Sequence, residues 1–320
     1  MDIAATLAWS SVLVALVAAP AQAQTISIVS TPSGSYTNSA GAAMAKVITE
    51  KTKLRAILQA QAQQGMIPVE AGNAEFGMGN AFDMTFYATG TGEYEGQGAK
   101  TKLRIAASLM PYRVAFHVRA DSDIKTIAEV RGKRIAGGFN AQKTIARITE
   151  ALLATAGLSY KDMVEVLAPN VSRAAEDFSS GKTDVLFFAL GSAAVKQAAA
   201  TLGGVRVLPT DDSPDAVRRM QEVLPGSYIL DVAPGPGIDG VSRPTKVLAF
   251  DMVLCTSIEV PERVVYEVVK ALHQNKSALA ATFAAFNLFA PDQMGKPIKD
   301  VELHPGALKY FQEAGIAPRS

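Results

Sequence analysis

The stretch Lys133–Gly157, KRIAGGFNAQKTIARITEALLATAG, contains one complete strand–loop–helix unit. Residues 133–137 form a short apolar segment that predicts a strand. A glycine-rich turn follows and leads into residues 142–156, where apolar residues recur every three or four positions, as they do in an amphipathic helix. Gly157 then ends the helix, because glycine is the common residue just after a helix C-terminus. A strand followed by a helix is the repeating unit of α/β proteins.

The same alternation of strand and helix patterns runs through almost the whole chain. We expect strands at residues 25–30, 54–59, 75–79, 103–110, 114–119, 133–137, 164–167, 184–188, 205–208 and 246–255, and helices at residues 39–51, 64–72, 142–156 and 261–286. Such alternation predicts an α/β fold whose strands are mostly parallel.

Two long strand-like segments, residues 114–119 and 246–255, stand at the junctions between two sets of α/β elements. This order is typical of a bilobed binding protein in which crossover strands form a hinge. It predicts one lobe made of residues 24–113 plus about 246–320 and a second lobe made of about 114–245. A ligand would bind in the cleft between them, where strands end and helices begin.

The N-terminal segment predicts export from the cytoplasm. Residues 3–23 are apolar and end in Ala21-Gln22-Ala23, the small-residue pattern that signal peptidase prefers. We therefore expect residues 1–23 to be a signal peptide, with cleavage near Ala23–Gln24 and a periplasmic mature protein. A single membrane anchor is the alternative, but the run is at the lower limit of a spanning length. A signal peptide usually carries Lys or Arg before its apolar run, but here only Asp2 stands there. The sequence alone does not establish Met1 as the natural start.

Composition and charge exclude several classes of function. Lys and Arg total 31 against 30 acids, a net charge of +1, which lacks the positive excess of a nucleic-acid-binding protein. The only cysteine, Cys255, allows no internal disulfide and lies in an apolar stretch, so we expect it to be buried. The histidines His117, His273 and His304 are far apart, and neither a zinc site nor a Ser-His-Asp triad is indicated. We expect no metal and no cofactor.

Three loops have a composition suited to anion binding: residues 31–38, 137–144 and 189–192. Each follows a strand, and the free N–H groups of a helix start can hold a carboxylate. Ordinary turns with helix caps are the alternative for any single loop, but three of them together favour a binding site. The candidate ligand-binding residues are Ser33, Ser35, Tyr36, Asn140, Gln142, Thr144 and, as a weaker candidate, Ser192 from these loops, together with Asn80, which follows the strand at residues 75–79.

Arg113 is a further candidate because it precedes the crossover strand at residues 114–119. The guanidinium group can bond both oxygens of a carboxylate. The alternative is an ion pair at the surface or between the lobes.

Several short motifs occur in the order known from one family of solute receptors. They are the first loop with Gly41-Ala42-Ala43-Met44-Ala45, Leu109-Met110-Pro111, the segment 127–135, Gly181-Lys182-Thr183-Asp184, the segment 260–266 and Leu303-His304-Pro305-Gly306-Ala307. In this order, and over almost the whole chain after residue 23, they resemble the TAXI-type solute receptors of TRAP transporters. The sequence departs from that family at Thr37, at Asn80 and at Phe139-Asn140-Ala141, all of which are positions expected near the ligand.

The resemblance implies a bilobed, type II-like periplasmic-binding-protein fold and a protein that is not an enzyme. It implies capture of a small organic acid or amino acid, such as glutamate or a dicarboxylate, and delivery to the membrane permease subunits of a TRAP transporter. A substrate-binding subunit of an ABC importer is the alternative. A periplasmic enzyme would need titratable groups in the three loops, which carry only Lys143 and Tyr36.

Overall fold

The computed structural model describes residues 23–316. The predicted signal peptide lies in residues 1–23, almost entirely outside the described part of the chain, and stays a prediction. Within residues 23–316, no helix has the length and apolar character needed to cross a membrane.

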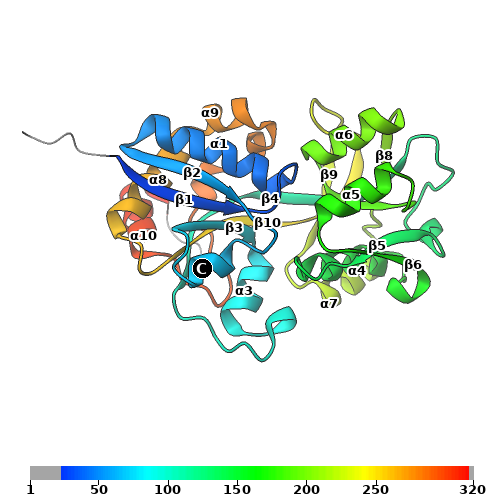
Figure 1. The fold of residues 1–320 in the computed structure, drawn as a ribbon, viewed down its shortest axis with the longest axis horizontal. Coiled ribbons are helices and arrows are strands. Elements are labelled where there is room, and N and C mark those ends of the chain that lie inside the picture. The colour runs from blue at the N-terminus through cyan, green and yellow to red at the C-terminus, as the bar shows by residue number, and fades with distance from the viewer. Residues whose placement is uncertain (1–22, 317–320) are drawn as a thin grey trace, which may run out of the picture.

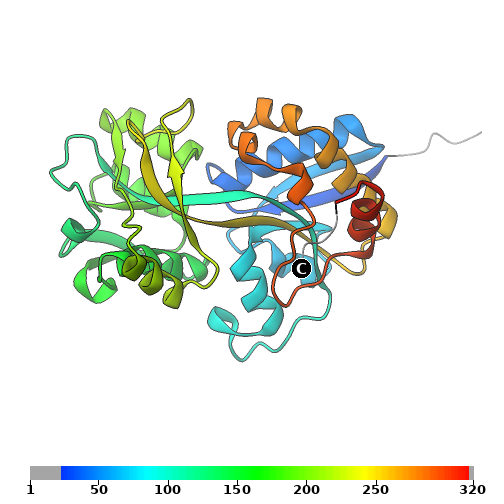
Figure 2. The same cartoon turned by 180° about the vertical axis from the view of Figure 1, so that it is seen from behind.

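The chain folds into two lobes that are joined by two long strands, β4 (Leu103–Arg119) and β10 (Thr245–Ser257) (Figures 1 and 2). The predicted bilobed α/β fold is confirmed. The residue division between the lobes stays a prediction, and β4 passes without a break through the predicted boundary at residue 113.

Lobe 1 contains the N-terminal elements and the C-terminal helices. Its elements are β1 (Gln24–Ser30), α1 (Tyr36–Lys51), β2 (Leu54–Ala60), α2 (Met66–Glu70), β3 (Phe76–Asn80), α3 (Ala81–Thr89), η1 (Gly92–Tyr94), α8 (Glu262–Gln274), α9 (Lys276–Thr282), η4 (Ala284–Leu288), η5 (Pro291–Gln293) and α10 (Pro305–Glu313).

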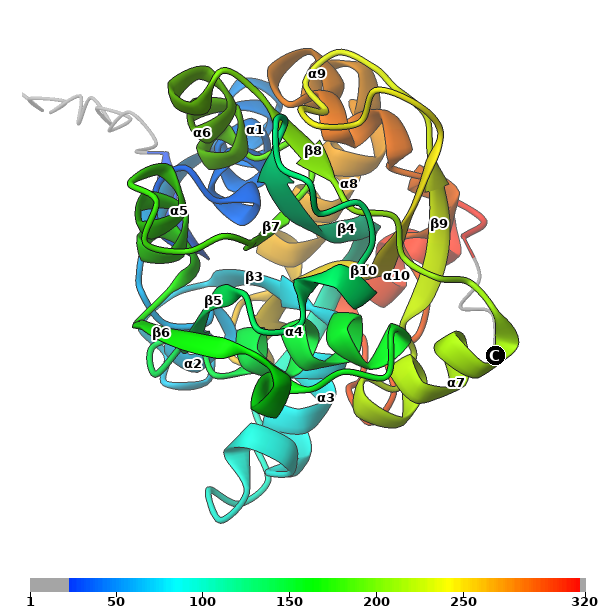
Figure 3. The ribbon, with the colours of Figure 1, turned by 90° about the vertical axis from the view of Figure 1, so that its right-hand side faces the viewer.

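Lobe 2 is formed by the chain between the two long strands. Its elements are η2 (Ala128–Val130), β5 (Arg134–Gly138), α4 (Thr144–Thr155), η3 (Tyr160–Asp162), β6 (Val164–Ala168), α5 (Val171–Ser179), β7 (Leu186–Ala189), α6 (Ala193–Leu202), β8 (Val205–Val207), α7 (Pro214–Val223) and β9 (Tyr228–Val232). Figure 3 looks onto this lobe, with α6 on one side of β4 and β7 and with α4 and α7 on the other.

The main sheet has the strand order β2-β1-β3-β10-β4-β7, with β8 also paired to β4 and β9 to β10. Strands β1, β2 and β3 are parallel, and so are β5 and β6 in a separate pair. All pairings of β4 and β10 with the other strands of the sheet are antiparallel. The prediction of mostly parallel strands is therefore wrong, because β4 leaves lobe 1 while β10 returns to it, and the two lie side by side in opposite directions.

The strands predicted at residues 103–110 and 114–119 are one strand. Pro111 lies inside β4 opposite Asp251, and the register of the two strands shifts between Asp251 and Val253. A proline cannot donate a ladder hydrogen bond, so it is accommodated where the pairing is irregular.

Two helix predictions also differ from the structure. The helix expected at residues 261–286 is broken, because α8 ends at Gln274 and α9 begins after Asn275. Helix α3 was not predicted, although Asn80 with an acidic residue three positions later is a helix-start signal.

The core lies between the sheet and the helices that cover it in both lobes. Met44 of α1 and Phe76 of β3 are fully buried in lobe 1, and Phe116 of β4 and Leu152 of α4 are fully buried in lobe 2. Cys255 is free and buried, as predicted. Its burial raises the pKa of the thiol, so it behaves as a small apolar side chain.

Candidate functional site

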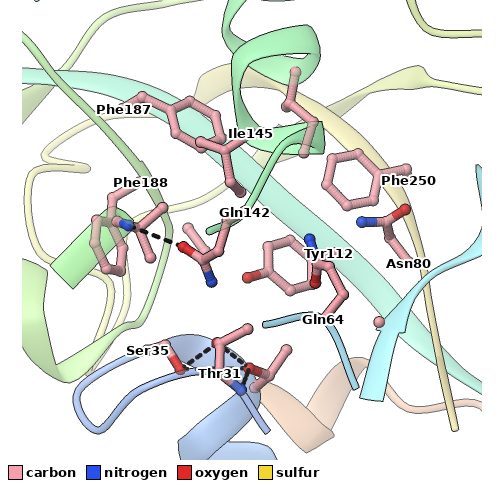
Figure 4. A pocket seen from close by; sticks show the side chains of 15 residues that line it. Thr31, Ser35, Gln64, Asn80, Tyr112, Gln142, Ile145, Phe187, Phe188 and Phe250 are labelled. Carbon is pink, nitrogen blue, oxygen red and sulfur yellow. Dashed lines mark hydrogen bonds between the residues drawn. The ribbon is translucent and has the colours of Figure 1, made fainter. Parts of the chain in front are cut away.

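A small cavity of about 40 Å³ lies between the two lobes at the starts of four helices (Figure 4). It is lined by Thr31, Ser35, Thr37, Gln64, Gly79, Asn80, Tyr112, Gln142, Ile145, Ile148, Val171, Phe187, Phe188, Ala189 and Phe250. These residues come from lobe 1, from lobe 2 and from both connecting strands. No lining residue carries a charged side chain. The cavity has room for about three water molecules, since a cavity needs roughly 10–15 Å³ to hold one.

One side of the cavity is a cluster of hydroxyl groups at the start of α1. The Thr31 hydroxyl donates to Ser35 Oγ at 2.7 Å and lies 2.5 Å from Thr37 Oγ1. Ser35 caps α1 by accepting a hydrogen bond from Asn38 N at 3.2 Å. Serine and threonine are common at this position because the hydroxyl satisfies one of the free N–H groups of the first turn. The cluster therefore fixes three hydroxyls beside the positive end of α1.

Three amide side chains line the cavity, and the orientation of two of them, Asn80 of lobe 1 and Gln142 of lobe 2, is set by hydrogen bonds to helix starts. Asn80 Oδ1 accepts a hydrogen bond from Asp83 N at 2.8 Å, and Gln142 Oε1 accepts one from Val171 N at 2.9 Å. Because each amide oxygen is engaged, the NH₂ group is left for the other side. Figure 4 shows the nitrogen of Asn80 and that of Gln142 directed into the space around Tyr112. The cavity therefore receives two amide donors.

Tyr112 and three phenylalanines form the remaining wall. The Tyr112 ring stacks on Phe250, with centroids 5.1 Å apart and planes at 12°. Its hydroxyl points to the side of Gln142 (Figure 4). Burial raises the pKa of Tyr112 above its ordinary value, so the phenol stays protonated and can donate a hydrogen bond. Phe187 and Phe188 close the lobe 2 side.

Four helices begin at this cavity. Ser35 and Asn80 cap α1 and α3, while Gln142 and Val171 lie at the starts of α4 and α5. The first turn of each helix carries a partial positive charge of roughly half an elementary charge, although Asn38 N, Asp83 N and Val171 N are already bonded to side chains. Since no acidic group lines the cavity, the arrangement favours an anion.

The structure brings three of the predicted residues, Ser35, Asn80 and Gln142, together in the cavity wall. Thr144 lies just behind that wall. Its hydroxyl accepts a hydrogen bond from Gln64 Nε2 at 2.8 Å and donates to Asp83 Oδ2 at 3.2 Å.

Four other predicted residues do not line the cavity. Ser33 and Asn140 are exposed on their loops. Ser192 is buried, and its hydroxyl donates to the carbonyl of Ala189 at 2.8 Å. Tyr36 is fully buried and packs its ring 4.8 Å from that of Tyr112, so its place is in the core beside the cavity. Contact with a ligand in this closed form would require these side chains to move.

Arg113 is also absent from the lining, because neighbouring residues of a strand face opposite sides and Tyr112 faces the cavity. It is the only buried arginine or lysine in residues 23–316, and its Nε has no hydrogen-bond partner among them. Burial lowers the pKa of Arg113, and the smaller electrostatic effect of Tyr36 raises it. Burial likewise raises the pKa of Tyr36, and the charge of Arg113 lowers it. The guanidinium is thus a buried positive charge near the cavity, not in its wall.

Thr37, which was expected near the ligand, lines the cavity, whereas Thr31, Gln64, Tyr112 and Phe250 were not predicted as site residues. Thr31 and Thr37 lie in the first loop, and Tyr112 follows Leu109-Met110-Pro111, so both motifs marked the right segments. Gln64 and Phe250 carried no local signal. Within residues 23–316, no group of three or more His, Cys, Asp or Glu side chains is placed to hold a metal ion.

A sequence model of the NMT1-like family matches residues 29–315. The chain belongs to the NMT1-like family. The predicted membership of the TAXI family is a finer assignment that this match does not make, and it stays a prediction.

Solved structures with the same fold are distant in sequence. One described as a periplasmic transporter is 13% identical, with a TM-score of 0.57 and coverage of 92% of this chain and 93% of the other. MatC from Rhodopseudomonas palustris with bound malate is 14% identical, with a TM-score of 0.55 and coverage of 84% and 92%. A protein from Bordetella bronchiseptica RB50 is 12% identical, with a TM-score of 0.53 and coverage of 91% and 98%. At these identities the likeness establishes the fold of this NMT1-like protein.

Proposed function

We propose that this protein is a periplasmic solute-binding receptor that captures a small carboxylate between its lobes and delivers it to a membrane permease. The observation that carries the proposal is the closed cavity of neutral hydrogen-bond donors at four helix starts. The protein would act by binding alone, without catalysis, and TRAP-type permease subunits are its proposed partner.

The donors of the cavity suit a carboxylate. In Figure 4 the NH₂ nitrogen of Gln142 and the hydroxyl of Tyr112 are drawn on one side of the Tyr112 ring, and the NH₂ nitrogen of Asn80 is drawn on its other side. Hydrogen bonds from neutral donors to a charged acceptor are stronger than neutral pairs. Arg113 is buried and its Nε has no hydrogen-bond partner within residues 23–316, so its charge adds a positive field near this space, and burying a charge without a counterion is costly. The bound malate of MatC, which has a similar fold, is consistent with this class of ligand.

The lining also narrows the ligand class. An amino acid would need an acidic group to hold its ammonium, and no aspartate or glutamate lines the cavity. We therefore favour a carboxylate without an amino group over glutamate. Phe250 also lines a second, more open hollow of about 360 Å³, together with Phe82 and Phe86. A longer acid would place its carboxylate in the cavity and its apolar part beside these rings.

Hinge closure is the proposed mechanism. Strands β4 and β10 join the lobes, and the cavity takes residues from both lobes, so a ligand bound there stabilises the closed form. A dissociation constant of about 1 μM corresponds to about −8 kcal/mol. Two or three charge-assisted hydrogen bonds in a closed site are of the right order.

A thermal-shift screen tests the proposal. Protein from Gln24 onward would be unfolded and refolded to remove any bound ligand, then heated with acetate, propionate, lactate, pyruvate, malate, citrate and glutamate. We expect a rise of several degrees for one chemical group, because a ligand that binds only the folded state stabilises it. A melting temperature unchanged by every acid would count against a carboxylate receptor.

The transporter type needs a separate experiment, because the substrate-binding subunit of an ABC importer is also a bilobed receptor that closes on its ligand. The ligand-loaded protein would be mixed with membranes containing the candidate permease, with and without an ATPase subunit. Binding to a permease that has no ATPase supports the TRAP-type assignment, and binding only in the presence of the ATPase supports the alternative.

A further inference from the structure

Behind the cavity wall lies a buried carboxylate, that of Asp83 in the first turn of α3. None of its surface is exposed. One oxygen accepts a hydrogen bond from the Tyr94 hydroxyl at 3.0 Å, and the other accepts one from the Thr144 hydroxyl at 3.2 Å. Within residues 23–316, Asp83 takes part in no ion pair. The carboxylate is therefore held by neutral donors and by the start of α3, while its complete burial disfavours the negative charge.

The hydrogen bonds of Asp83 cross between the lobes. Thr144 is the first residue of α4 in lobe 2, whereas Asp83 and Tyr94 belong to lobe 1. Gln64, a cavity-lining residue of lobe 1, donates to the same Thr144 hydroxyl at 2.8 Å. Opening the cleft would separate Thr144 from both partners and admit water to the carboxylate. The environment of Asp83 is thus tied to closure.

The groups around Asp83 supply no free positive charge. The titratable groups on α3 and the elements around it are Tyr87 on α3 itself, Glu93 and Tyr94 on η1, Lys246, Asp251 and Cys255 on β10, and Arg147 and Glu150 on α4, while β3 contributes none. Lys246 pairs with Asp212, and Asp251 pairs with Lys296. The other cation is Arg147. Its Nε pairs with Glu93, and its guanidinium lies 5.0 Å from the ring centroid of Phe86.

Burial raises the pKa of Asp83 to about 7, and the hydrogen bonds from Tyr94 and Thr144 lower it by less. A second negative charge in the neighbouring cavity would disfavour the ionised carboxylate further.

We propose that closure of the lobes on the anionic ligand takes up one proton at Asp83, so that the receptor captures its ligand as an anion together with a proton. The proton comes from solvent and bonds to one carboxylate oxygen, and the hydrogen bond at that oxygen reverses, so that Asp83 donates to the hydroxyl of Tyr94 or Thr144. This inference rests on the proposed anion-binding function of the cavity.

The direction of the pH dependence follows from the two states. In the open form water reaches Asp83, and its pKa returns toward the ordinary value of about 4. The closed form then binds more protons than the open form between about pH 4 and pH 7. Closure is therefore favoured as the pH falls through this window and is independent of pH above it. For a closed-state pKa of about 7, ligand affinity is expected to be about tenfold higher at pH 6 than at pH 8.

Carbon-13 NMR of protein labelled at its aspartate carboxyl carbons tests the proton site without any ligand. The Asp83 signal is assigned as the one lost in Asp83→Asn, and Asp123→Asn, at an exposed position of lobe 2, serves as the matched control. Small-angle X-ray scattering at each pH follows closure. Where the radius of gyration matches that of the closed structure, we expect the Asp83 signal to titrate well above pH 5, and where it is larger we expect a midpoint near pH 4. A midpoint below pH 5 in protein whose radius of gyration matches the closed structure overturns the proposal.

Ligand binding provides the second test, with malate and propionate as probes. The dissociation constant of the wild-type protein should be about ten times lower at pH 6 than at pH 8. The dissociation constant of the Asp83→Asn variant, whose side chain mimics the protonated acid, should change by less than twofold between the same pH values. A wild-type constant that is the same at both pH values also overturns the proposal, even when Asp83→Asn fails to fold. If neither probe binds at any pH, the carboxylate function loses support, and the NMR result still decides the proton site.

Discussion

Replacing Gln142 by glutamate tests the anion site with a minimal change of shape. Gln142 Oε1 accepts the hydrogen bond of Val171 N at 2.9 Å, and a glutamate oxygen can do the same. Only the cavity-facing NH₂ group is exchanged, and it is exchanged for oxygen. The substitution therefore converts a donor to the ligand into a negative charge and leaves the start of α5 intact.

The expected loss of affinity has two parts. A hydrogen bond to a charged group contributes about 1.5–3 kcal/mol. Two like charges about 4 Å apart repel by about 4 kcal/mol at an effective dielectric constant of about 20. Together they correspond to a loss of at least about a thousandfold in affinity where the introduced carboxylate is ionised, because about 1.4 kcal/mol equals a factor of ten.

The assay is isothermal titration calorimetry at pH 8 with the best acid of the thermal-shift screen, with far-UV circular dichroism to check folding. The matched control is Gln197→Glu on the exposed side of α6, which adds the same charge far from the cavity wall and should bind like the wild type. A folded Gln142→Glu protein that binds within threefold of the wild type would refute the placement of the ligand at this side chain.

Three further predictions concern neighbouring groups. Tyr112→Phe removes the hydroxyl that faces the cavity and should weaken carboxylate binding by about 1–2 kcal/mol in calorimetry; unchanged affinity would mean that the phenol does not contact the ligand. Ser35→Ala removes the cap of α1 and should lower the free energy of unfolding by about 1 kcal/mol in urea denaturation, and no change there would contradict its capping role. Asp83→Asn removes a carboxylate whose pKa is raised to about 7, so wild-type stability should fall as the pH rises from about 4 to 7 while the variant stays level in thermal melts; parallel curves for the two proteins would argue against a buried carboxylate.

The local elements of the site were largely predictable from the sequence. The strand and helix around residues 133–157 were expected within one or two residues of β5 and α4, since their patterns of apolar residues are regular. The loops that were singled out as anion-binding contain Ser35 and Gln142, both in the cavity wall. Ser35 was also predictable as a cap, because capping depends on residues three positions apart.

The positions of other site residues depend on long-range packing. Gln64 reaches the cavity because Gly77 lets the chain at Gly65 approach closely: a Cβ at Gly77 would lie 2.3 Å from the carbonyl oxygen of Gly65. Phe250 faces the cavity because the register of β10 against β4 places Phe250 opposite Tyr112. Neither relation is visible in a local stretch of sequence. The sequence did not predict that Ser33 and Asn140 are exposed, since a loop motif does not specify which side chain of the loop turns inward.

By itself, the sequence determined the alternation of strands and helices, the crossover segments that make the protein bilobed and the polar loops at helix starts. These features depend on periodicity, capping and chain order, which act over a few residues or along the chain. Only the tertiary structure decided that four helix starts meet at one uncharged cavity, that Arg113 is buried beside Tyr36 and that Thr144 of lobe 2 donates to the buried carboxylate of Asp83 in lobe 1. Those relations join residues far apart in the chain. They depend on the register of β4 against β10 and on the closed position of the lobes.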